Sequence, residues 1–123
     1  MSGIPTLLRL QVQARDNNIC RRCGRLGNNV HHRITKGMGG NKSLRVNGLA
    51  ALVTLCGSGT TGCHGWVTEH PEEAYRLGWS IRRSEPDPAE SIPLVDIYGQ
   101  FFWLTDDGGV IYAETTQKET TNL

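Results

Sequence analysis

The chain has 123 residues, of which 37% are hydrophobic, and this size and composition suit one soluble domain. No apolar run approaches the roughly 20 residues of a bilayer-spanning helix, so neither a membrane span nor a membrane partner is expected. The net charge of +1 conceals an asymmetry, because residues 1–45 carry nine Lys and Arg and one acid, whereas the remainder carries four bases and eleven acids. The basic part favours a polyanionic partner, although scattered surface charge is an alternative.

A helix is predicted for residues 5–18, the first element along the chain. Pro5 suits a first helical turn, and the apolar positions recur at roughly helical spacing. Arg9 and Arg15 are expected on the solvent side of this helix. Its apolar positions are Leu7, Leu8, Leu10, Val12 and Ala14.

Short turns and apolar segments follow the helix. A tight turn is predicted for residues 20–23, and a short strand is predicted for residues 27–35. Residues 36–47 are basic and rich in glycine, which indicates an exposed loop. The apolar run at residues 49–55 fits either a strand or the end of a short helix, because its length alone does not separate the two.

A second helical region is predicted for residues 64–77, after a glycine-rich loop at residues 56–63. The region is interrupted at His70-Pro71, because proline starts a helix readily but cannot continue one. Gly78 is expected to end it. Residues 79–83 are expected to form a strand.

The C-terminal part begins with an acidic, proline-rich segment at residues 84–93, which indicates a linker or extended loop. Residues 94–98, 101–105 and 110–113 are rich in strand formers, and the sequence TDDGG between the last two predicts a hairpin turn. The polar tail from Glu114 onward is expected to fray.

The four cysteines fall into the spacings Cys20-x2-Cys23 and Cys56-x6-Cys63. The N-terminal residues lack a secretory signal, so we expect a cytoplasmic protein, in which paired cysteines bind metal more often than they form disulfides. Four thiolates suit a tetrahedral structural Zn²⁺ that leaves no position open for water. Two disulfides or simple buried thiols are the alternatives.

Three of the four histidines lie beside these cysteines in the sequence. His31 and His32 follow the first cysteine pair, and His64 directly follows the last cysteine. A shared zinc ion would bring both stretches together in space. Adjacent residues of a strand point to opposite sides, so His31 and His32 are expected to have different roles.

The arrangement CRRCG, VHHR and LVTLCGSGTTGCHGWV resembles the HNH endonucleases, in the branch with zinc-binding cysteines, and is similar to small phage HNH proteins. The resemblance covers residues 15–79, and the C-terminal hairpin is similar too. It implies that His31 and His64 are ligands of a catalytic divalent ion and that His32 is the general base. The family usually has Asn where this chain has Ala51, and that Asn orients the catalytic loop or helps to hold the metal.

The expected fold is therefore α+β, with a small ββα-metal (His-Me finger) core, a four-cysteine zinc site, an N-terminal helix and a C-terminal β-hairpin. Residues 1–83 are expected to hold the helix and the nuclease core. Residues 84–123 are expected to add the acidic linker, the hairpin and the tail to the same domain.

The expected function is metal-dependent cleavage or nicking of DNA with low sequence specificity. The catalytic ion would be Mg²⁺, Mn²⁺, Ni²⁺ or Zn²⁺, since imidazole ligands favour the later transition metals and abundance favours Mg²⁺. Phosphate contacts, which carry little sequence information, are expected from basic residues after His32. These residues are Arg33, Lys36, Lys42 and Arg45.

Two other functions also fit this sequence. Ala51 in place of the family Asn favours a non-catalytic zinc module that binds DNA or protein. The likeness to phage HNH proteins and the acidic C-terminal half suggest a DNA-packaging accessory that docks on the terminase large subunit. For His31 and His32 as a pair, capping a strand or packing near the zinc is the alternative to a role in catalysis.

Overall fold

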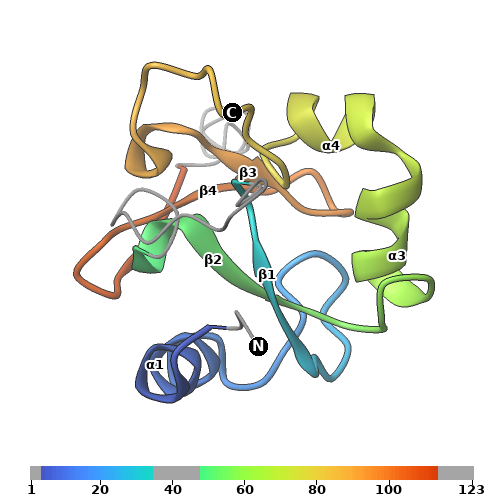
Figure 1. Cartoon of the computed structure of the whole chain (residues 1–123), viewed down its shortest axis with the longest axis vertical. Coiled ribbons are helices and arrows are strands. Elements are labelled where there is room, and N and C mark those ends of the chain that lie inside the picture. Colours follow the sequence, from blue (N-terminus) through green and yellow to red (C-terminus); the bar gives the residue numbers. More distant parts are fainter. Residues whose placement is uncertain (1–3, 35–47, 114–123) are drawn as a thin grey trace, which may run out of the picture.

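The computed structural model describes residues 4–34 and 48–113, which form a small mixed α+β architecture (Figure 1). The expected α+β class is confirmed. In chain order the elements are α1 (Thr6–Asp16), β1 (Asn29–His32), the 3-10 helix η1 (Leu49–Ala51), β2 (Leu52–Leu55), α3 (Gly62–Glu69), α4 (Pro71–Arg76), the 3-10 helix η2 (Ala89–Ser91), β3 (Leu94–Val95), β4 (Phe101–Leu104) and β5 (Val110–Tyr112).

The antiparallel pair of β1 and β2 lies at the centre of the molecule. Every side chain of β2 is buried, because its apolar sequence is covered on both faces. On one face, Val30 and Leu52 pack against Val12 of α1. On the other face, Val53 and Leu55 join the larger hydrophobic core. The strand pair therefore separates α1 from the rest of the structure.

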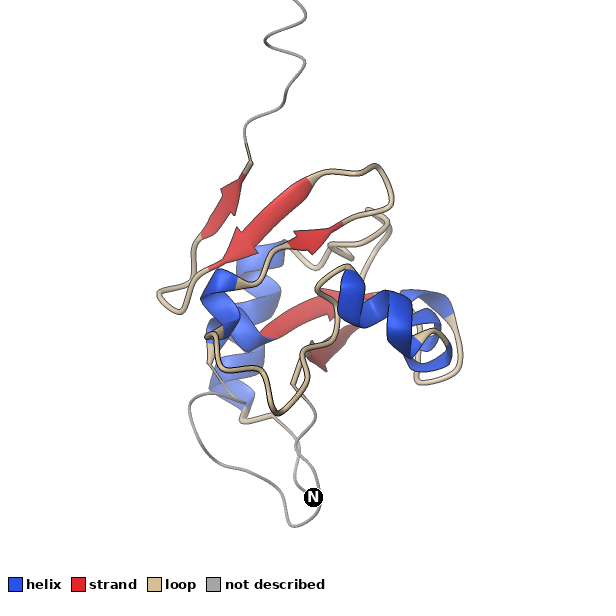
Figure 2. Ribbon diagram, turned by 90° about the horizontal axis from the view of Figure 1, so that it is seen from above, coloured by secondary structure: helices blue, strands red, loops and turns tan. Residues whose placement is uncertain are grey.

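The second sheet consists of β3, β4 and β5 in an antiparallel meander. Its inner face contributes Leu94, Phe102 and Leu104 to the larger core, where they pack together with Val53 and Trp79. Residues before and after position 84 thus share one core. Figure 2 shows these three strands at the periphery of the molecule.

Three segments differ in kind or extent from the sequence-based expectations. Residues 79–83 do not form a strand, because only Ile81 makes a bridge, with Ile34. Residues 84–93, expected to be a linker or extended loop, contain the 3-10 helix η2, which packs Ala89 into the core. The strand at 94–98 ends at Val95, because the carboxylate of Asp96 accepts hydrogen bonds from the backbone N–H groups of Tyr98 and Gln100 and closes a turn. The expected loop at 36–47 and the tail from Glu114 lie outside the described residues.

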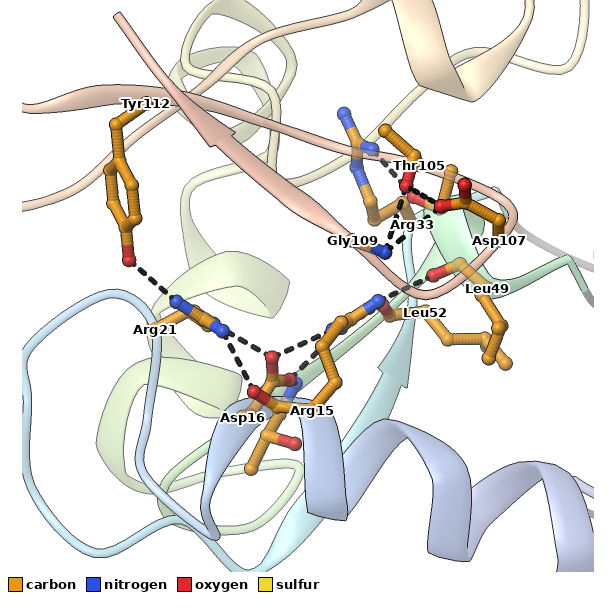
Figure 3. Close-up of polar contacts among 12 residues, drawn as sticks. Arg15, Asp16, Arg21, Arg33, Leu49, Leu52, Thr105, Asp107, Gly109 and Tyr112 are labelled. Carbon is orange, nitrogen blue, oxygen red and sulfur yellow. Dashed lines mark hydrogen bonds and ion pairs between the residues drawn. The ribbon is translucent and has the colours of Figure 1, made fainter.

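The helix α1 ends in a buried ion-pair cluster around Asp16, drawn in Figure 3. Arg15 and Arg21 both donate to the Asp16 carboxylate, and the backbone N–H of Thr54 donates to its second oxygen. Arg15 also donates to the carbonyls of Leu49 and Leu52. The expectation that Arg15 faces solvent is therefore wrong, because its guanidinium joins α1 to the strand pair.

Replacing Asp16 with Asn is expected to lower the free energy of unfolding by about 3–5 kcal/mol, because the buried guanidinium of Arg15 and the half-buried guanidinium of Arg21 lose their counter-charge. Burial raises the pKa of Asp16, but the hydrogen bonds and charges of Arg15 and Arg21 outweigh it and hold the pKa below its ordinary value of 3.8. The carboxylate therefore stabilises the fold fully above pH 3.8 and loses this effect as the pH falls through the lowered pKa.

Urea unfolding followed by circular dichroism, at neutral pH and in steps below pH 4, measures this effect. Exposed Glu69 provides the charge-matched control, since Glu69→Gln removes a carboxylate that is not buried. Equal stability of Asp16→Asn and Glu69→Gln at neutral pH would contradict the structural role of Asp16.

Candidate metal centre

Four cysteines from two separate segments converge on one point. Cys20 and Cys23 lie in the turn after α1, Cys56 follows β2, and Cys63 lies in the first turn of α3. All four sulfur atoms lie within 4.8 Å of one another, and the Sγ atoms of Cys23 and Cys56 are 3.6 Å apart. A tetrahedral zinc ion with Zn–S bonds of about 2.3 Å requires sulfurs roughly 3.8 Å apart. The cysteines thus have the spacing to hold a zinc ion, as their sequence spacing predicted.

The loop between β2 and α3 depends on glycine for its shape. Gly57 has a φ of 90° and Gly62 has a φ of 64°, a region that L-residues rarely adopt. A Cβ atom at Gly57 would overlap the carbonyl oxygen of Thr61. This tight reversal allows the backbone N–H of Cys63 to approach the sulfur of Cys56, with N and Sγ 3.4 Å apart.

The electrostatics of the cluster also favour a bound cation. Burial raises the pKa of the Cys20 and Cys63 thiols. Burial also acts on Cys56, but hydrogen bonds from the Cys63 backbone and from neighbouring thiols outweigh it and lower its pKa. Four thiolates this close repel one another, so a divalent ion is needed for all four to ionise together.

Arg22 is a member of this site that the sequence reasoning missed. Its Nη1 donates to the sulfur of Cys63 over 3.1 Å, and its guanidinium lies 3.8 Å from the centre of the Trp66 ring. Arg22 lies between Cys20 and Cys23 in the sequence, and a cation at that position stabilises thiolates. This position in the motif could have identified Arg22 as a residue of the cysteine site.

The histidine rings of β1 and α3 form a second cluster beside the cysteines. The ring centroids of His31 and His64 are 5.3 Å apart, and the rings meet edge to face. The Nε2 of His31 lies 2.8 Å from the carbonyl oxygen of Trp79. The Nδ1 of His64 is buried, and among the described residues it has no hydrogen-bond partner. The sequence-based expectation that these two stretches approach each other agrees with this geometry.

Both imidazoles are in an environment that favours the neutral ring. Burial lowers the pKa of His31 to about 4, and the charges of His64, His32 and Arg33 act in the same direction. Burial also lowers the pKa of His64. In the neutral His31 ring, donation from Nε2 to the Trp79 carbonyl leaves the lone pair on Nδ1, which is the arrangement of a metal-binding histidine with an oriented ring.

The ligand set of this second cluster is small. Within residues 4–34 and 48–113, the cysteines are the only group of three or more His, Cys, Asp and Glu side chains with metal-ligand spacing. A divalent ion at His31 and His64 would therefore take its remaining ligands from water or from a substrate phosphate, unless residues outside these ranges contribute.

His32 lies on the other face of β1. It pairs with Leu52, whose side chain belongs to the cluster that packs against α1. The alternation of a strand therefore directs His32 away from the His31 and His64 rings. Its side chain is half-buried at the C-terminal end of the strand.

Arg33 does not have the position expected of a phosphate-contacting residue. Its side chain is 1% exposed, and its guanidinium donates to four backbone carbonyls, those of Gly78, Ala50, Ala89 and Ile92. Burial lowers its pKa to about 9, so it remains a cation at neutral pH. The DNA-binding role predicted for Arg33 is therefore corrected to a structural one. Lys36, Lys42 and Arg45 lie outside the described residues.

Ala51, which stands where the resembled family has Asn, is buried at the end of η1. Its carbonyl accepts the backbone N–H of Arg33 over 2.8 Å. The backbone of Arg33 in turn accepts the N–H of Ile81 over 2.7 Å. The end of β1 is thus held through Arg33 rather than through a side chain at position 51.

No family model, curated protein or solved structure matches this chain. Among the described residues, no helix has both the length and the apolar character needed to cross a membrane.

Proposed function

We propose that this protein is a metal-dependent endonuclease of the HNH type that cleaves or nicks DNA with low sequence specificity. The observation that carries the proposal is the approach of His31 and His64, with ring centroids 5.3 Å apart and the buried Nδ1 of His64 lacking a partner among the described residues. A buried polar atom left without a hydrogen bond is costly, and a metal ion would compensate for it.

The order of elements supports this proposal. The antiparallel strands β1 and β2 are followed by α3, with His31 on the first strand and His64 in the first turn of the helix. This order and these positions agree with a ββα-metal core. The cysteine cluster joins the turn before β1 to the loop before α3. A zinc ion there would fix the position of β1, which carries His31, relative to α3, which carries His64.

In the proposed reaction, neutral His32 accepts a proton from a water molecule whose oxygen forms the new bond to phosphorus. The bond from phosphorus to the 3′ oxygen breaks, and this oxygen takes a proton from solvent water, which leaves a 5′-phosphate and a 3′-hydroxyl. A divalent cation held by His31 and His64 would bind the scissile phosphate and stabilise charge on the leaving oxygen. Because His31 and His32 leave the strand on opposite sides, the substrate would have to lie across the C-terminal end of β1.

The proposed DNA contacts come from basic residues that are not part of the buried core. Arg25 is exposed in the turn after the first cysteine pair. Lys36, Lys42 and Arg45 belong to the same proposal by their place in the sequence after His32. Such contacts are to phosphates, so binding should weaken steeply with salt and show little sequence preference.

Replacing His32 with Ala is expected to reduce nicking of supercoiled plasmid by about 100-fold or more, the usual contribution of a positioned general base. The assay uses Mg²⁺, Mn²⁺ and Ni²⁺ in parallel, since the ligand set does not select one of them. His64→Ala is expected to reduce nicking as well and also to weaken binding of Ni²⁺, measured by calorimetry. His32→Ala should leave that binding unchanged.

His70→Ala is the matched control, because His70 is exposed and its ring stacks on Trp66, whereas the His31 ring contacts that of His64. It should nick at the wild-type rate. Each variant needs an unchanged circular dichroism spectrum and zinc content. Wild-type nicking by His32→Ala would remove His32 from the mechanism, and the absence of nicking by the wild-type protein with every metal would remove the endonuclease proposal.

The second candidate function is a non-catalytic zinc-supported module that binds DNA or docks on a phage terminase large subunit. The observation that favours it is the small ligand set, since only two imidazoles meet in the described part of the chain. This module would bind DNA or the terminase subunit without nicking, and His32→Ala would leave the binding intact. Pull-down with the large subunit and gel-shift assays on DNA separate these two forms.

A further inference from the structure

A cavity of about 290 Å³ lies between the turn after α1 and the sheet of β3, β4 and β5. One wall comes from residues 17–24, and the other comes from the turn between β3 and β4 and from the strands β4 and β5. The backbone N–H of Ile97 donates to the carbonyl of Arg22 over 3.0 Å and joins the two walls. The cavity borders the cysteine cluster at Cys20, but no histidine of the described residues lines it. Its chemistry is therefore separate from that of the proposed catalytic ion.

Aromatic rings supply the flat surfaces of this cavity. Phe102 is buried, whereas Tyr98 and Tyr112 are 77% and 55% exposed, and all three line the cavity. The ring centroids of Phe102 and Tyr112 are 5.9 Å apart. The guanidinium of Arg21 lies 6.0 Å from the centre of the Phe102 ring. Aromatic rings and a guanidinium plane are surfaces on which a planar group stacks.

Arg21 provides hydrogen-bond donors on the wall that follows α1. Figure 3 shows its guanidinium between the hydroxyl of Tyr112 and the carboxylate of Asp16. A further N–H donates to the backbone carbonyl of Arg15. A guanidinium carries more N–H groups than these contacts with described residues use, so donors remain for a ligand. Because Arg15 and Arg21 share the single charge of Asp16, these ion-paired side chains together retain a net positive charge.

Asp96 provides an acceptor on the opposite wall. Its Oδ1 accepts the backbone N–H groups of Tyr98 and Gln100, each over 2.9 Å, and these contacts close the turn between β3 and β4. Both contacts use the same oxygen, so Oδ2 of this half-buried carboxylate can accept a hydrogen bond from a ligand. The cavity therefore has a cationic donor on one wall and an anionic acceptor on the other.

The size and polarity of the cavity select a neutral, planar ligand with donors and acceptors on its edge. A cavity of about 150 Å³ holds benzene, so the cavity of about 290 Å³ has room for a bicyclic ring. Asp96 would repel a phosphate, and a purely apolar group would leave Arg21 and Asp96 without partners in a desolvated site. A nucleobase has a face that stacks and an edge that carries donors beside acceptors. In a duplex that edge is used in pairing, so an unpaired base is the ligand that fits.

We propose that this cavity, the base pocket, binds an unpaired nucleobase. The base stacks on the tyrosine rings, presents an acceptor to Arg21 and presents an N–H donor to Asp96. Arg25 is exposed beside Gly24 of the pocket wall, where it can contact the phosphate attached to the base. The base belongs either to a single strand or to a free nucleotide, which share this chemistry. The proposal goes beyond the proposed endonuclease, because it needs neither a catalytic ion nor a cutting reaction.

Fluorescence anisotropy on the full chain tests the base pocket with three labelled ligands: a single strand of about 12 nucleotides, the same strand paired with its complement, and a deoxynucleoside monophosphate. The buffer contains neither a chelator nor an added divalent ion, so that the cysteine cluster is undisturbed and the DNA is not cut. Tyr98→Ala is expected to weaken single-strand binding about 10-fold or more, because a stacking ring is lost, and to leave duplex binding unchanged. Ile97→Ala is the matched control, because Ile97 is 52% exposed beside Tyr98 but does not line the cavity.

Replacing Asp96 with Asn separates the pocket from the general effect of charge. Asparagine keeps the oxygen that closes the turn but has a donor in place of the second oxygen. Removal of a negative charge by itself strengthens DNA binding, and this is the expected result for the control Asp87→Asn, at an exposed position outside the pocket. Asp96→Asn is expected instead to weaken single-strand binding, because the base loses its acceptor. Each variant must keep the wild-type circular dichroism spectrum.

The monophosphate distinguishes the two sources of the base. An affinity comparable to that of the strand assigns the pocket to a free nucleotide, and a much weaker affinity assigns it to a base within a strand. A wild type that binds neither ligand, an unchanged affinity in Tyr98→Ala, or tighter binding by Asp96→Asn would each overturn the proposal. Nicking is not measured in this experiment, so failure of the endonuclease proposal would leave the base pocket standing.

Discussion

Replacing Cys20 with Ser is expected to abolish zinc binding and cooperative folding together. Cys20 is buried, and its sulfur belongs to the group of four that lies within 4.8 Å. Structural zinc sites of this type contribute about 10–16 kcal/mol in small peptides, which equals or exceeds the about 5–15 kcal/mol by which whole domains are stable. A site that joins two distant segments of a small core should therefore decide whether the chain folds.

Elemental analysis of the purified protein should give one zinc per chain for the wild type and none for Cys20→Ser. Circular dichroism melting curves should show a cooperative transition only for the wild type, and a strong chelator should reproduce the effect of the variant. Thr60→Ala is the control, since Thr60 is an exposed residue of the loop between Cys56 and Cys63. A metal-free wild type that melts cooperatively at an unchanged temperature would contradict a structural zinc ion.

Replacing Arg33 with Met is expected to destabilise the fold, because Arg33 is buried and its guanidinium holds four backbone carbonyls. Four carbonyls would lose their donor, at a cost of about 1–3 kcal/mol for each one left buried and unpaired. Removal of a buried charge offsets part of this cost. The net loss in the free energy of unfolding should be about 2–4 kcal/mol. Arg33→Lys should lose less, because an ammonium group retains the charge and some of the donors.

Urea unfolding at neutral pH measures both substitutions, and Arg25→Met is the control because Arg25 is exposed. If Arg33→Met unfolds at the same urea concentration as Arg25→Met, then the four carbonyl contacts carry no net stability. Loss of Arg33 should also disturb His31, because Arg33 holds the carbonyl of Gly78 and His31 contacts the carbonyl of the next residue, Trp79. Histidine nitrogen chemical shifts would report that change.

The prediction of the cysteine cluster succeeded because its signal is local. A two-residue spacer brings Cys20 and Cys23 onto one turn, and the glycines between Cys56 and Cys63 allow a tight return. The interruption at His70-Pro71 was also predicted, since proline lacks the N–H that a continuing helix needs. The hairpin of β4 and β5 followed from the turn sequence TDDGG.

The two arginines were placed wrongly for a shared reason. Arg15 and Arg33 were expected at the surface, and both are buried. Charged side chains are buried only when they find partners, and these partners are distant in sequence. Arg33 donates to carbonyls of residues 78, 89 and 92, and Arg15 to that of Leu52. Neither the local charge pattern nor the hydrophobic periodicity of the sequence predicts contacts between such distant residues.

By itself, the sequence determined the α+β class, the gathering of four cysteines, the split of the second helical region and the C-terminal hairpin, because each depends on backbone preferences or short spacings. Only the tertiary structure decided which guanidinium groups are buried and which apolar side chains stay exposed. Those properties depend on which surfaces of distant segments cover one another, and a buried charge is tolerated only where such packing supplies its hydrogen-bond partners.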